Sequence, residues 1–352
     1  MSGGVDSSVA AYLTLQQGLQ CIGATMRLFS GDLLPENEES TCCSLDDTED
    51  ARSVAHRLGI PFYVFNFSRD FREKVMDDFV SCYEQGLTPN PCIQCNRHLK
   101  FSKLLERARI LGCGSVVTGH YARIKQDEAT GRYLLYKALD TNKDQSYVLY
   151  CLTQDQLAHT RLPLGELTKE QVRSIAEEQG FLNSHKKDSQ DICFVPDGDY
   201  VAFMERYTKK QYPGGDYLDL NGKVVGRHKG AVCYTIGQRK GLNLAMGSPV
   251  YVCSKDMQAN TVTVGPNEAL FRTTLLAKDL NFFPFDKLAQ PIRVKAKARY
   301  RMTEQSATIY PEGEDTVRVE FDEPQRAITP GQSVVFYDGD LVIGGGTITQ
   351  VI

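Results

Sequence analysis

The stretch "SGGVDSS" at residues 2–8 decides the fold of this 352-residue chain, because it has the composition of a phosphate-binding loop. Gly3 and Gly4 let backbone N–H groups turn toward an anion without steric conflict from a Cβ atom. The serines that follow open a helix whose N-terminal dipole favours that anion. Asp6 suits such a loop only if it holds Mg²⁺ or orders the loop. A simple Ser/Gly turn capping a helix stays open as the alternative.

The loop does not end in the Gly-Lys-Ser/Thr of a Walker A motif, which argues against a kinase or a GTPase. Behind it, helical and strand patterns alternate. Helices are predicted at residues 6–18, 47–58, 71–85 and 95–111, and strands at 20–29, 62–67 and 115–120. This alternation predicts βαβ units with a parallel sheet covered by helices. A further helix has a predicted capping box, Thr168 with Gln171, and ends at Gly180.

The second half of the chain has a different pattern from about residue 205 onward. Gly- and Pro-rich turns become frequent, and the runs between them are short and alternate apolar with polar residues. This pattern predicts small mainly-β domains, the last a β-barrel. The predicted fold is therefore an α/β domain over residues 1–204, a small central β-rich domain over 205–268, and a C-terminal β-barrel over 269–352.

The composition predicts a soluble cytoplasmic protein with no membrane partner. Apolar residues make up 41% and charged residues 24%, and no run approaches the roughly 18 apolar residues that cross a bilayer. Eleven cysteines without a secretion signal indicate reduced thiols, with chemistry or metal binding at a few of them. The net charge of −4 gives no global indication of nucleic-acid binding, so a polyanion partner would need a local basic surface.

Three cysteines stand in informative surroundings. Cys92 and Cys95 lie in "GLTPNPCIQCNRHLKF" (86–101), after a stiff Pro-Asn-Pro entry and before a helix predicted to begin near Asn96. A thiol at a helix N-terminus is more acidic, and the nearby basic residues act in the same direction. Cys193 lies in "KKDSQDICFVP" (186–196). No second C-x-x-C exists, which argues against a closed structural zinc site.

The stretch "PIRVKAKARYR" (291–301) carries a basic residue at every second position. On a strand, this period places all of them on one face, where they suit a phosphate backbone. A solvated strand face is the alternative. The residues are Arg293, Lys295, Lys297, Arg299 and Arg301.

Taken together, eight motifs resemble the tRNA-specific 2-thiouridylases of the PP-loop ATP pyrophosphatase superfamily, in order over the whole chain. They are "SGGVDSS", "TPNPCIQCNRHLKF", "TGHYAR", "TNKDQSYVLY", "KKDSQDICF", "TIGQRKGL", "RYR" and "TPGQSVVFYDGD". The resemblance implies ATP-dependent 2-thiolation of the wobble uridine of tRNA, through adenylation of the uridine 2-oxygen and cysteine-mediated sulfur transfer. It also implies Mg²⁺, release of AMP and pyrophosphate, and a sulfur-donor protein (a persulfide carrier or a cysteine desulfurase), with no DNA partner.

The resemblance assigns roles to individual residues. Cys193 would carry sulfur as a persulfide, and Cys95 would attack to release it, through a Cys95–Cys193 disulfide. Residues implied for nucleotide binding are Ser2, Gly3, Gly4, Val5, Asp6, Ser7, Met26 and Gly119. Residues implied for tRNA binding are Asn90, Pro91, Cys92, His120, Lys143, Asp144, Gln145, Arg299, Tyr300 and Gln332.

Cys92 departs from the family pattern, because many relatives have Asp there. Cys92, Cys95 and Cys193 could instead bind three irons of a [4Fe–4S] cluster, leaving the fourth iron for hydrosulfide. The persulfide route and the cluster route both stay open. Two other functions also stay open: a PP-loop amidotransferase or synthetase, and a catalytically impaired tRNA-binding protein.

The start of the sequence raises a separate expectation. A doubly wound domain places its nucleotide loop after an interior strand, and no such strand precedes residue 2. We expect Met1 to be an internal methionine, with the native chain beginning about ten residues earlier in an apolar strand.

Overall fold

The computed structural model describes residues 1–29, 45–186 and 192–352. The chain divides into two compact units. The first unit contains Met1–Met76, Pro91–Asp199 and Asp340–Ile343, and the second contains Asp77–Asn90, Tyr200–Gly339 and Gly344–Ile352. The phosphate loop and the three highlighted cysteines therefore all lie in the first unit.

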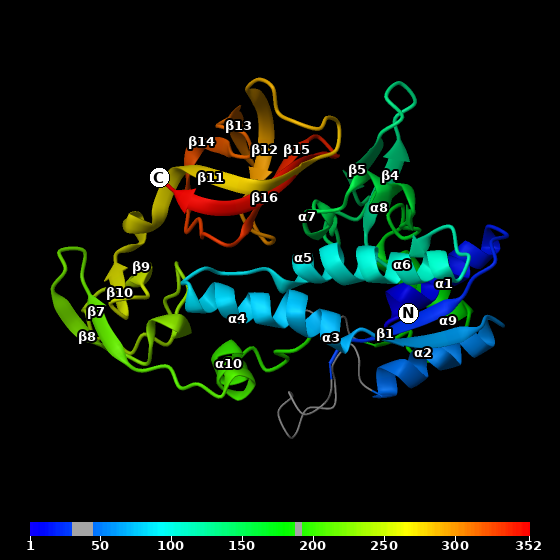
Figure 1. Ribbon diagram of the computed structural model, residues 1–352, viewed down its shortest axis with the longest axis horizontal. Coiled ribbons are helices and arrows are strands. Elements are labelled where there is room, and N and C mark those ends of the chain that lie inside the picture. Colours follow the sequence, from blue (N-terminus) through cyan, green and yellow to red (C-terminus); the bar gives the residue numbers. More distant parts are fainter. Residues whose placement is uncertain (30–44, 187–191) are drawn as a thin grey trace. The chain divides into compact units, whose positions relative to one another are not determined.

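Parallel strand pairing, as predicted, is the basis of the first unit (Figure 1). β1 (Gly23–Arg27) pairs in parallel with β2 (Phe62–Asn66), and the helix α2 (Leu45–Arg57) connects them. β3 (Val116–Val117) pairs in parallel with β6 (Thr160–Arg161). Within the described residues, these are two separate two-stranded sheets rather than one continuous sheet.

The core of the first unit fixes the helix that follows the phosphate loop. Val5, Val9 and Ala10 of α1 (Val5–Gln16) pack with Val172 and Ala176 of α9 (Lys169–Glu178) in one buried cluster. The predicted capping box of α9 is confirmed, because the Gln171 N–H donates to Thr168 Oγ1 at 3.3 Å and the Thr168 N–H donates to Gln171 Oε1 at 2.8 Å. Burial of α1 against α9 therefore fixes where the loop ends.

The helix that carries Cys92 and Cys95 begins earlier than predicted. Its first segment is α5 (Pro91–Cys95), and it continues through the π turns of η3 (Asn96–Lys103) into α6 (Leu104–Ile110). The prediction of a start near Asn96 is wrong because Pro91 occupies the first helical position, where its missing N–H costs no hydrogen bond. Cys92 thus lies in the first turn, and Cys95 lies one turn further in.

The remaining elements of the first unit are short. Leu341, at the start of β16, pairs with Tyr136 of β5, which forms an antiparallel hairpin with β4. The sequence pattern did not predict this hairpin. The bounds are α3 (Ser68–Phe71), η2 (Arg72–Met76), β4 (Ala122–Gln126), β5 (Tyr133–Lys137), α7 (Ser146–Leu149) and α8 (Gln154–Ala158).

The second unit begins with two helices joined by aromatic contacts. The Phe79 ring of α4 (Asp77–Glu84) meets Phe203 of α10 (Tyr200–Thr208) edge-on at 6.0 Å. Beside them a four-stranded sheet has the order β8-β7-β10-β9. Its strands are β7 (Gly215–Leu218), β8 (Val224–His228), β9 (Tyr251–Asp256) and β10 (Thr261–Gly265), and two 3₁₀ turns are η4 (Ala231–Cys233) and η5 (Asn267–Leu270).

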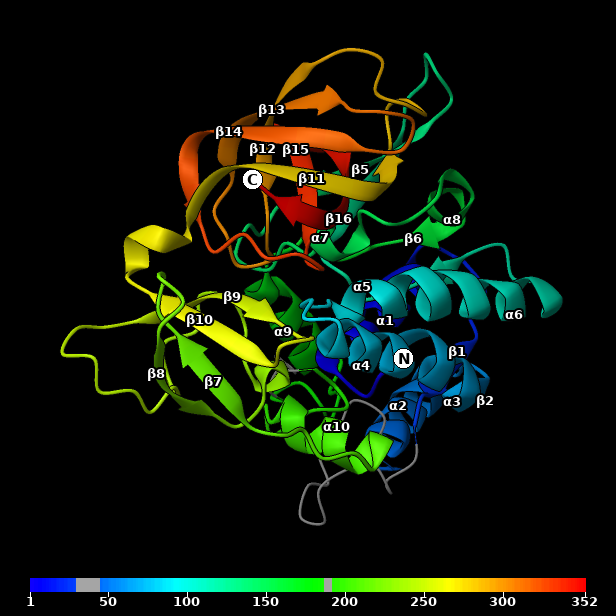
Figure 2. The same cartoon turned by 60° about the vertical axis from the view of Figure 1, so that its left-hand side comes forward.

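The predicted C-terminal β-barrel is confirmed (Figures 1 and 2). Its order is β11-β14-β13-β12-β15-β16, and pairing of β11 with β16 closes the ring. Closure leaves no free strand edge in the ring. The strands are β11 (Phe271–Phe282), β12 (Ile292–Lys297), β13 (Gln305–Pro311), β14 (Val317–Arg326), β15 (Ser333–Asp338) and β16 (Leu341–Val351). Among the helices of the described residues, none has the length and apolar character to cross a membrane.

Candidate active site

The phosphate loop is closed on itself by serine hydrogen bonds. The Ser2 N–H donates to Ser7 Oγ at 3.1 Å, and Ser7 Oγ donates to the Gly4 carbonyl at 2.9 Å. Gly4 is the N-cap of α1 and supplies no side-chain cap. The first N–H groups of a helix have no intrahelical acceptor, so an anion can take the place of a cap here. The geometry suits a phosphate.

Two of the residues implied for nucleotide binding are glycines for a steric reason. Gly3 has φ +72°, and a Cβ atom on it would overlap the Asp47 backbone. A Cβ atom on Gly119 would lie only 2.7 Å from the carbonyl carbon of Asp6 and 2.8 Å from the Ser7 nitrogen. Gly119 therefore packs directly against the start of α1. Met26, the predicted adenine contact, is half-buried on β1 opposite Phe65.

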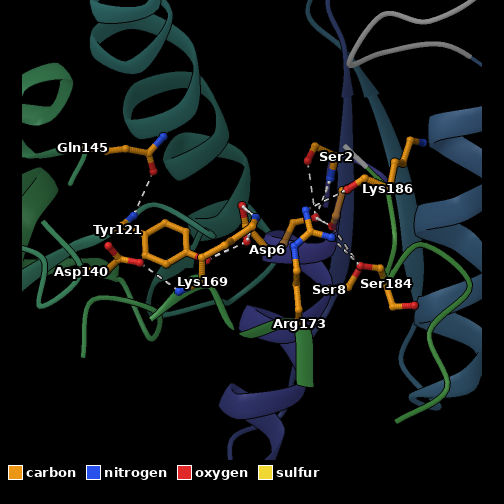
Figure 3. Close-up of polar contacts among 12 residues, drawn as sticks. Ser2, Asp6, Ser8, Tyr121, Asp140, Gln145, Lys169, Arg173, Ser184 and Lys186 are labelled. Carbon is orange, nitrogen blue, oxygen red and sulfur yellow. Dashed lines mark hydrogen bonds and ion pairs between the residues drawn. The ribbon is translucent and has the colours of Figure 1, made fainter. Parts of the chain in front are cut away.

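Asp6 is held by two residues that the sequence analysis did not identify (Figure 3). Lys169 Nζ lies 2.7 and 2.9 Å from the two carboxylate oxygens of Asp6, and Tyr121 Oη donates to Asp6 Oδ1 at 2.9 Å. The Lys169 side chain is 10% exposed and that of Asp6 29%. Tyr121 lies within the quoted motif "TGHYAR", and Lys169 directly follows the capping residue Thr168. These two positions are the sequence features from which a role for Tyr121 and Lys169 could have been inferred.

A second set of contacts attaches the loop to the chain that leads toward Cys193. Buried Asn183 donates from Nδ2 to the Gly3 carbonyl at 2.8 Å and to Ser8 Oγ at 3.0 Å. Arg173 donates to the Ser184 carbonyl at 3.0 Å (Figure 3). Sequence reasoning missed Asn183, since nothing in its local pattern marks it.

Lys186 continues this attachment. Its ammonium lies 2.6 Å from Asp47 Oδ1 and 2.7 Å from Asp50 Oδ2. Burial lowers the pKa of Lys186, but the hydrogen bonds to the two carboxylates outweigh burial, and its pKa is raised. Residues 187–191 of the stretch "KKDSQDICFVP" lie outside the described residues.

The three cysteines differ in exposure. Cys92 is exposed, Cys95 is buried and Cys193 is half-buried. Within residues 1–29, 45–186 and 192–352, no three His, Cys, Asp or Glu side chains lie close enough to hold a metal ion. In the structure as described, Cys92, Cys95 and Cys193 are not gathered around one site, as the ligands of a [4Fe–4S] cluster would be.

His120 is a buried side chain. Its Nδ1 lies 2.8 Å from Thr118 Oγ1, and the Phe101 ring lies 5.7 Å away. Burial, aided by the nearby Lys100 charge, lowers the pKa of His120 well below its ordinary value. As a predicted tRNA contact, His120 can offer a hydrogen bond at neutral pH but no charge.

The predicted tRNA contacts at Asp144 and Gln145 organise their own loop. The Asp144 carboxylate accepts hydrogen bonds from the Ala138 N–H at 3.0 Å and from Ser146 Oγ at 2.8 Å. Gln145 makes two hydrogen bonds with the Tyr121 backbone. Its side-chain Oε1 accepts from the Tyr121 N–H at 3.0 Å, and its backbone N–H donates to the Tyr121 carbonyl at 2.8 Å. Gln145 thus supports Tyr121, which in turn holds Asp6. Neighbouring Lys143 is half-buried.

In the second unit, Gln332 binds the loop that precedes Asn90, another predicted tRNA contact. Its Nε2 donates to the Thr88 carbonyl at 2.9 Å and to the Pro89 carbonyl at 3.2 Å. The Thr88 N–H donates to the Pro330 carbonyl at 2.9 Å. The structure therefore gives Gln332 a contact within the protein that the sequence did not predict.

The predicted single strand face is confirmed for Arg293, Lys295 and Lys297 and is wrong for Arg299 and Arg301, which lie beyond the end of β12. β12 ends at Lys297, and a turn with a hydrogen bond from the Met302 N–H to the Arg299 carbonyl follows. Arg293 forms a two-pronged ion pair with Asp322 at 2.8 and 2.6 Å. Lys295 donates to Ser306 Oγ, and Lys297 lies 3.8 Å from Glu304. Arg299 and Tyr300 are exposed in the turn.

Comparison with protein families divides the chain into three matched regions. Residues 1–197 match the tRNA methyl transferase HUP domain, and residues 201–266 match the tRNA methyl transferase PRC-barrel domain. Residues 272–348 match the aminomethyltransferase beta-barrel domain. The matches agree with an α/β domain followed by two β-rich domains.

Curated relatives match over nearly the whole chain. A tRNA-specific 2-thiouridylase MnmA from Clostridioides difficile strain 630 is 54% identical over 350 residues, covering 99% of this chain and 97% of the relative. Proteins of the same name from Clostridium acetobutylicum and Symbiobacterium thermophilum are 52% and 53% identical, covering 99% and 100% of this chain and 98% and 91% of the relatives. A solved NMN synthetase from Francisella tularensis aligns with 60% of this chain and 76% of its own, at 20% identity and a TM-score of 0.33, which is too distant to support a conclusion.

Proposed function

The chain belongs to the tRNA-specific 2-thiouridylase family, and we propose that it thiolates the wobble uridine of tRNA by adenylating the 2-oxygen and then transferring sulfur through cysteine. Enzymes of this family are tRNA-uridine 2-sulfurtransferases, and the protein is one of them. The observation that carries the two-step mechanism is the joint presence, in the first unit, of a phosphate loop with an uncapped helix start and of the three thiols.

The activation step uses the loop. The uridine 2-oxygen is a poor leaving group, so its attack on the α-phosphorus of ATP, with departure of pyrophosphate, converts it into an AMP ester. The loop residues 2–7 and the first N–H groups of α1 would hold the phosphates, and Met26 and Gly119 would border the nucleotide. Mg²⁺ would be carried mainly by the phosphates of ATP, where it neutralises charge on the departing pyrophosphate.

The sulfur step uses two cysteines. The terminal sulfur of a Cys193 persulfide bonds to C2 of the base while the bond from C2 to the oxygen of AMP breaks. The Cys95 thiolate then attacks Cys193 Sγ, and the thiouridine leaves with the electron pair of the broken S–S bond. The resulting Cys95–Cys193 disulfide needs two electrons from a thiol reductant before a sulfur-donor protein reloads Cys193.

The tRNA contacts stay proposals. Exposed Arg299 and Tyr300 suit a phosphate and a base, and Asn90, Pro91 and Cys92 stand at the start of the cysteine helix. His120, Lys143, Asp144, Gln145 and Gln332 would act near the target base either directly or by supporting the loops described above. We propose that the domains meet near residues 204 and 268. Because tRNA is the substrate, we also propose that the reaction takes place in the cytoplasm.

Mass analysis of nucleosides tests the function. Unmodified tRNA is incubated with the protein, ATP, Mg²⁺ and a persulfide donor, and 2-thiouridine is quantified. We expect Cys95→Ser and Cys193→Ser to abolish the product while leaving ATP binding intact, and Cys253→Ser, on a strand of the second unit, to be active. Full activity of Cys95→Ser would refute the thiol step and favour a PP-loop amidotransferase or synthetase. Iron and acid-labile sulfide in active, anaerobically purified protein would favour the cluster route.

A further inference from the structure

A carboxylate in a phosphate loop poses an electrostatic problem. Asp6 is the second residue of α1, and its backbone lies where the loop would meet a nucleotide polyphosphate. A negative side chain there repels the ligand unless a cation compensates it. The structure shows how the charge is compensated, and this reasoning depends on the proposed ATP-binding role of the loop.

Lys169 supplies the compensating charge through a short, largely buried ion pair. Its ammonium reaches both carboxylate oxygens of Asp6, at 2.7 and 2.9 Å. The Tyr121 hydroxyl donates to the same carboxylate, and the Lys169 ammonium also lies 5.9 Å from the Tyr121 ring centroid. In Figure 3, Tyr121 and Lys169 lie on one side of Asp6, while Ser2 and Lys186 lie on the other. The carboxylate is thus directed away from Ser2.

The position of Lys169 is costly for its own helix. Lys169 is the first residue of α9, where the helix dipole disfavours a positive charge. It is nevertheless fixed there, because Thr168 caps the helix and the Lys169 N–H donates to Asp140 Oδ2 at 3.0 Å. A residue that opposes the local preference of its helix, and is held in place regardless, indicates a functional reason.

We propose that Lys169 is a positioning residue of the nucleotide site that acts through Asp6. It neutralises the carboxylate and, with Tyr121, holds it away from the phosphates, so that the loop N–H groups and the dipole of α1 face the nucleotide. On this assignment the Asp6 carboxylate is compensated in the loop but is not itself required for nucleotide binding. It is not the principal ligand of Mg²⁺.

A double-mutant cycle on ATP affinity tests the proposal, measured by titration calorimetry with ATP and Mg²⁺ in the absence of tRNA. We expect Lys169→Met to raise the Kd for ATP about 10- to 100-fold, since it leaves a partly buried carboxylate beside the phosphates. In an Asp6→Asn background, the same lysine substitution should change the Kd by less than about threefold, because no charge remains to be neutralised. Lys169→Arg should stay close to wild type.

Controls separate this effect from misfolding. Lys103→Met removes a half-buried lysine of the same unit that pairs with Asp70 and Glu106, and it should leave the Kd unchanged. If Lys169→Met does not fold, as judged by its thermal transition, Tyr121→Phe takes its place, with a smaller loss that also vanishes in the Asp6→Asn background.

Each outcome decides between specific explanations. Wild-type protein that binds no ATP would overturn the proposed function itself. ATP binding that is unaffected by Lys169→Met, or equally impaired with and without the Asp6 carboxylate, would overturn the positioning role alone. Loss of ATP binding in Asp6→Asn with Lys169 intact would also overturn it, since the carboxylate would then be required in its own right.

Discussion

The contact of Gln332 with the loop ahead of the cysteine helix leads to a prediction about the free protein. Both N–H bonds of the Gln332 amide point to carbonyls, of Thr88 at 2.9 Å and of Pro89 at 3.2 Å. An amide has only two such donors, so both are already used before tRNA binds. Gln332→Ala removes both hydrogen bonds and leaves the backbone bond from the Thr88 N–H to the Pro330 carbonyl.

The size of the effect follows from these bonds. A neutral hydrogen bond contributes about 0.5–1.5 kcal/mol, and Gln332 is only half-buried, so the two together stabilise the loop by about 1–2 kcal/mol. A change of about 1.4 kcal/mol is tenfold in an equilibrium constant, so local opening of the loop should become about 5- to 30-fold more frequent.

Hydrogen exchange of the free protein measures this opening at two amides. The Thr88 N–H is bonded to the Pro330 carbonyl and the Leu87 N–H to the Cys82 carbonyl, whereas Pro89 has no N–H. We expect both to exchange faster in Gln332→Ala, and we expect no change in Gln350→Ala, which removes an exposed glutamine of the same barrel.

Unchanged exchange of these amides in Gln332→Ala would refute the reasoning. If the variant nevertheless bound tRNA more weakly, Gln332 would be a direct tRNA contact without a role in the loop. Gln332→Glu provides a second check, because it replaces two donors by a carboxylate facing two carbonyl oxygens and should speed exchange at least as much as alanine.

Three further predictions concern single groups. Gly119→Ala should weaken ATP binding about 5- to 100-fold, because its Cβ would lie 2.7 Å from the Asp6 backbone, while Gly114→Ala, with open space around it, should not, as titration calorimetry can show. Burial lowers the pKa of Lys255 from 10.5 to about 8, so between these pH values the unfolded chain holds a proton that the folded chain has released, and the free energy of unfolding should rise with pH. Lys255→Met should remove up to about 3 kcal/mol of this rise, as denaturant unfolding at several pH values can show. Parallel curves of unfolding free energy against pH for the variant and the wild type would contradict the prediction. Arg299→Ala should reduce the slope of log K for tRNA binding against log salt concentration by about 0.9. Arg293→Ala should reduce it by less, because Asp322 already neutralises Arg293, and equal slopes for the two variants would contradict this.

Features of the fold that depend on local pattern could be predicted from the sequence. The capping box of Thr168 and Gln171 and the closed C-terminal barrel both follow from short-range residue patterns. The start of the cysteine helix could have been placed better, because Pro91 is a strong signal for the first helical position.

The residues that surround the loop could not be predicted in the same way. Lys169 and Asn183 reach the loop from 163 and 180 residues away, and hydrophobic periodicity carries no information about polar partners at such separations. The partners of the basic row could not be predicted for a related reason. Alternation predicted the strand face of Arg293 and Lys295, but acidic and hydroxyl partners on neighbouring strands, such as Asp322, use the charges that would otherwise face a polyanion.

The attachments of the loop suggest why its order and the thiol chemistry belong together. Asp6 is fixed from α9 by Lys169, and Gly3 is fixed by Asn183, which stands on the segment that continues toward Cys193. Both attachments pass through residues near α9, since Arg173 of that helix also binds the Ser184 carbonyl. A displacement of α9 would therefore move the ends of the loop and the start of the cysteine segment together. The helix that supplies Lys169 to the loop thus also determines where the segment that leads toward Cys193 begins.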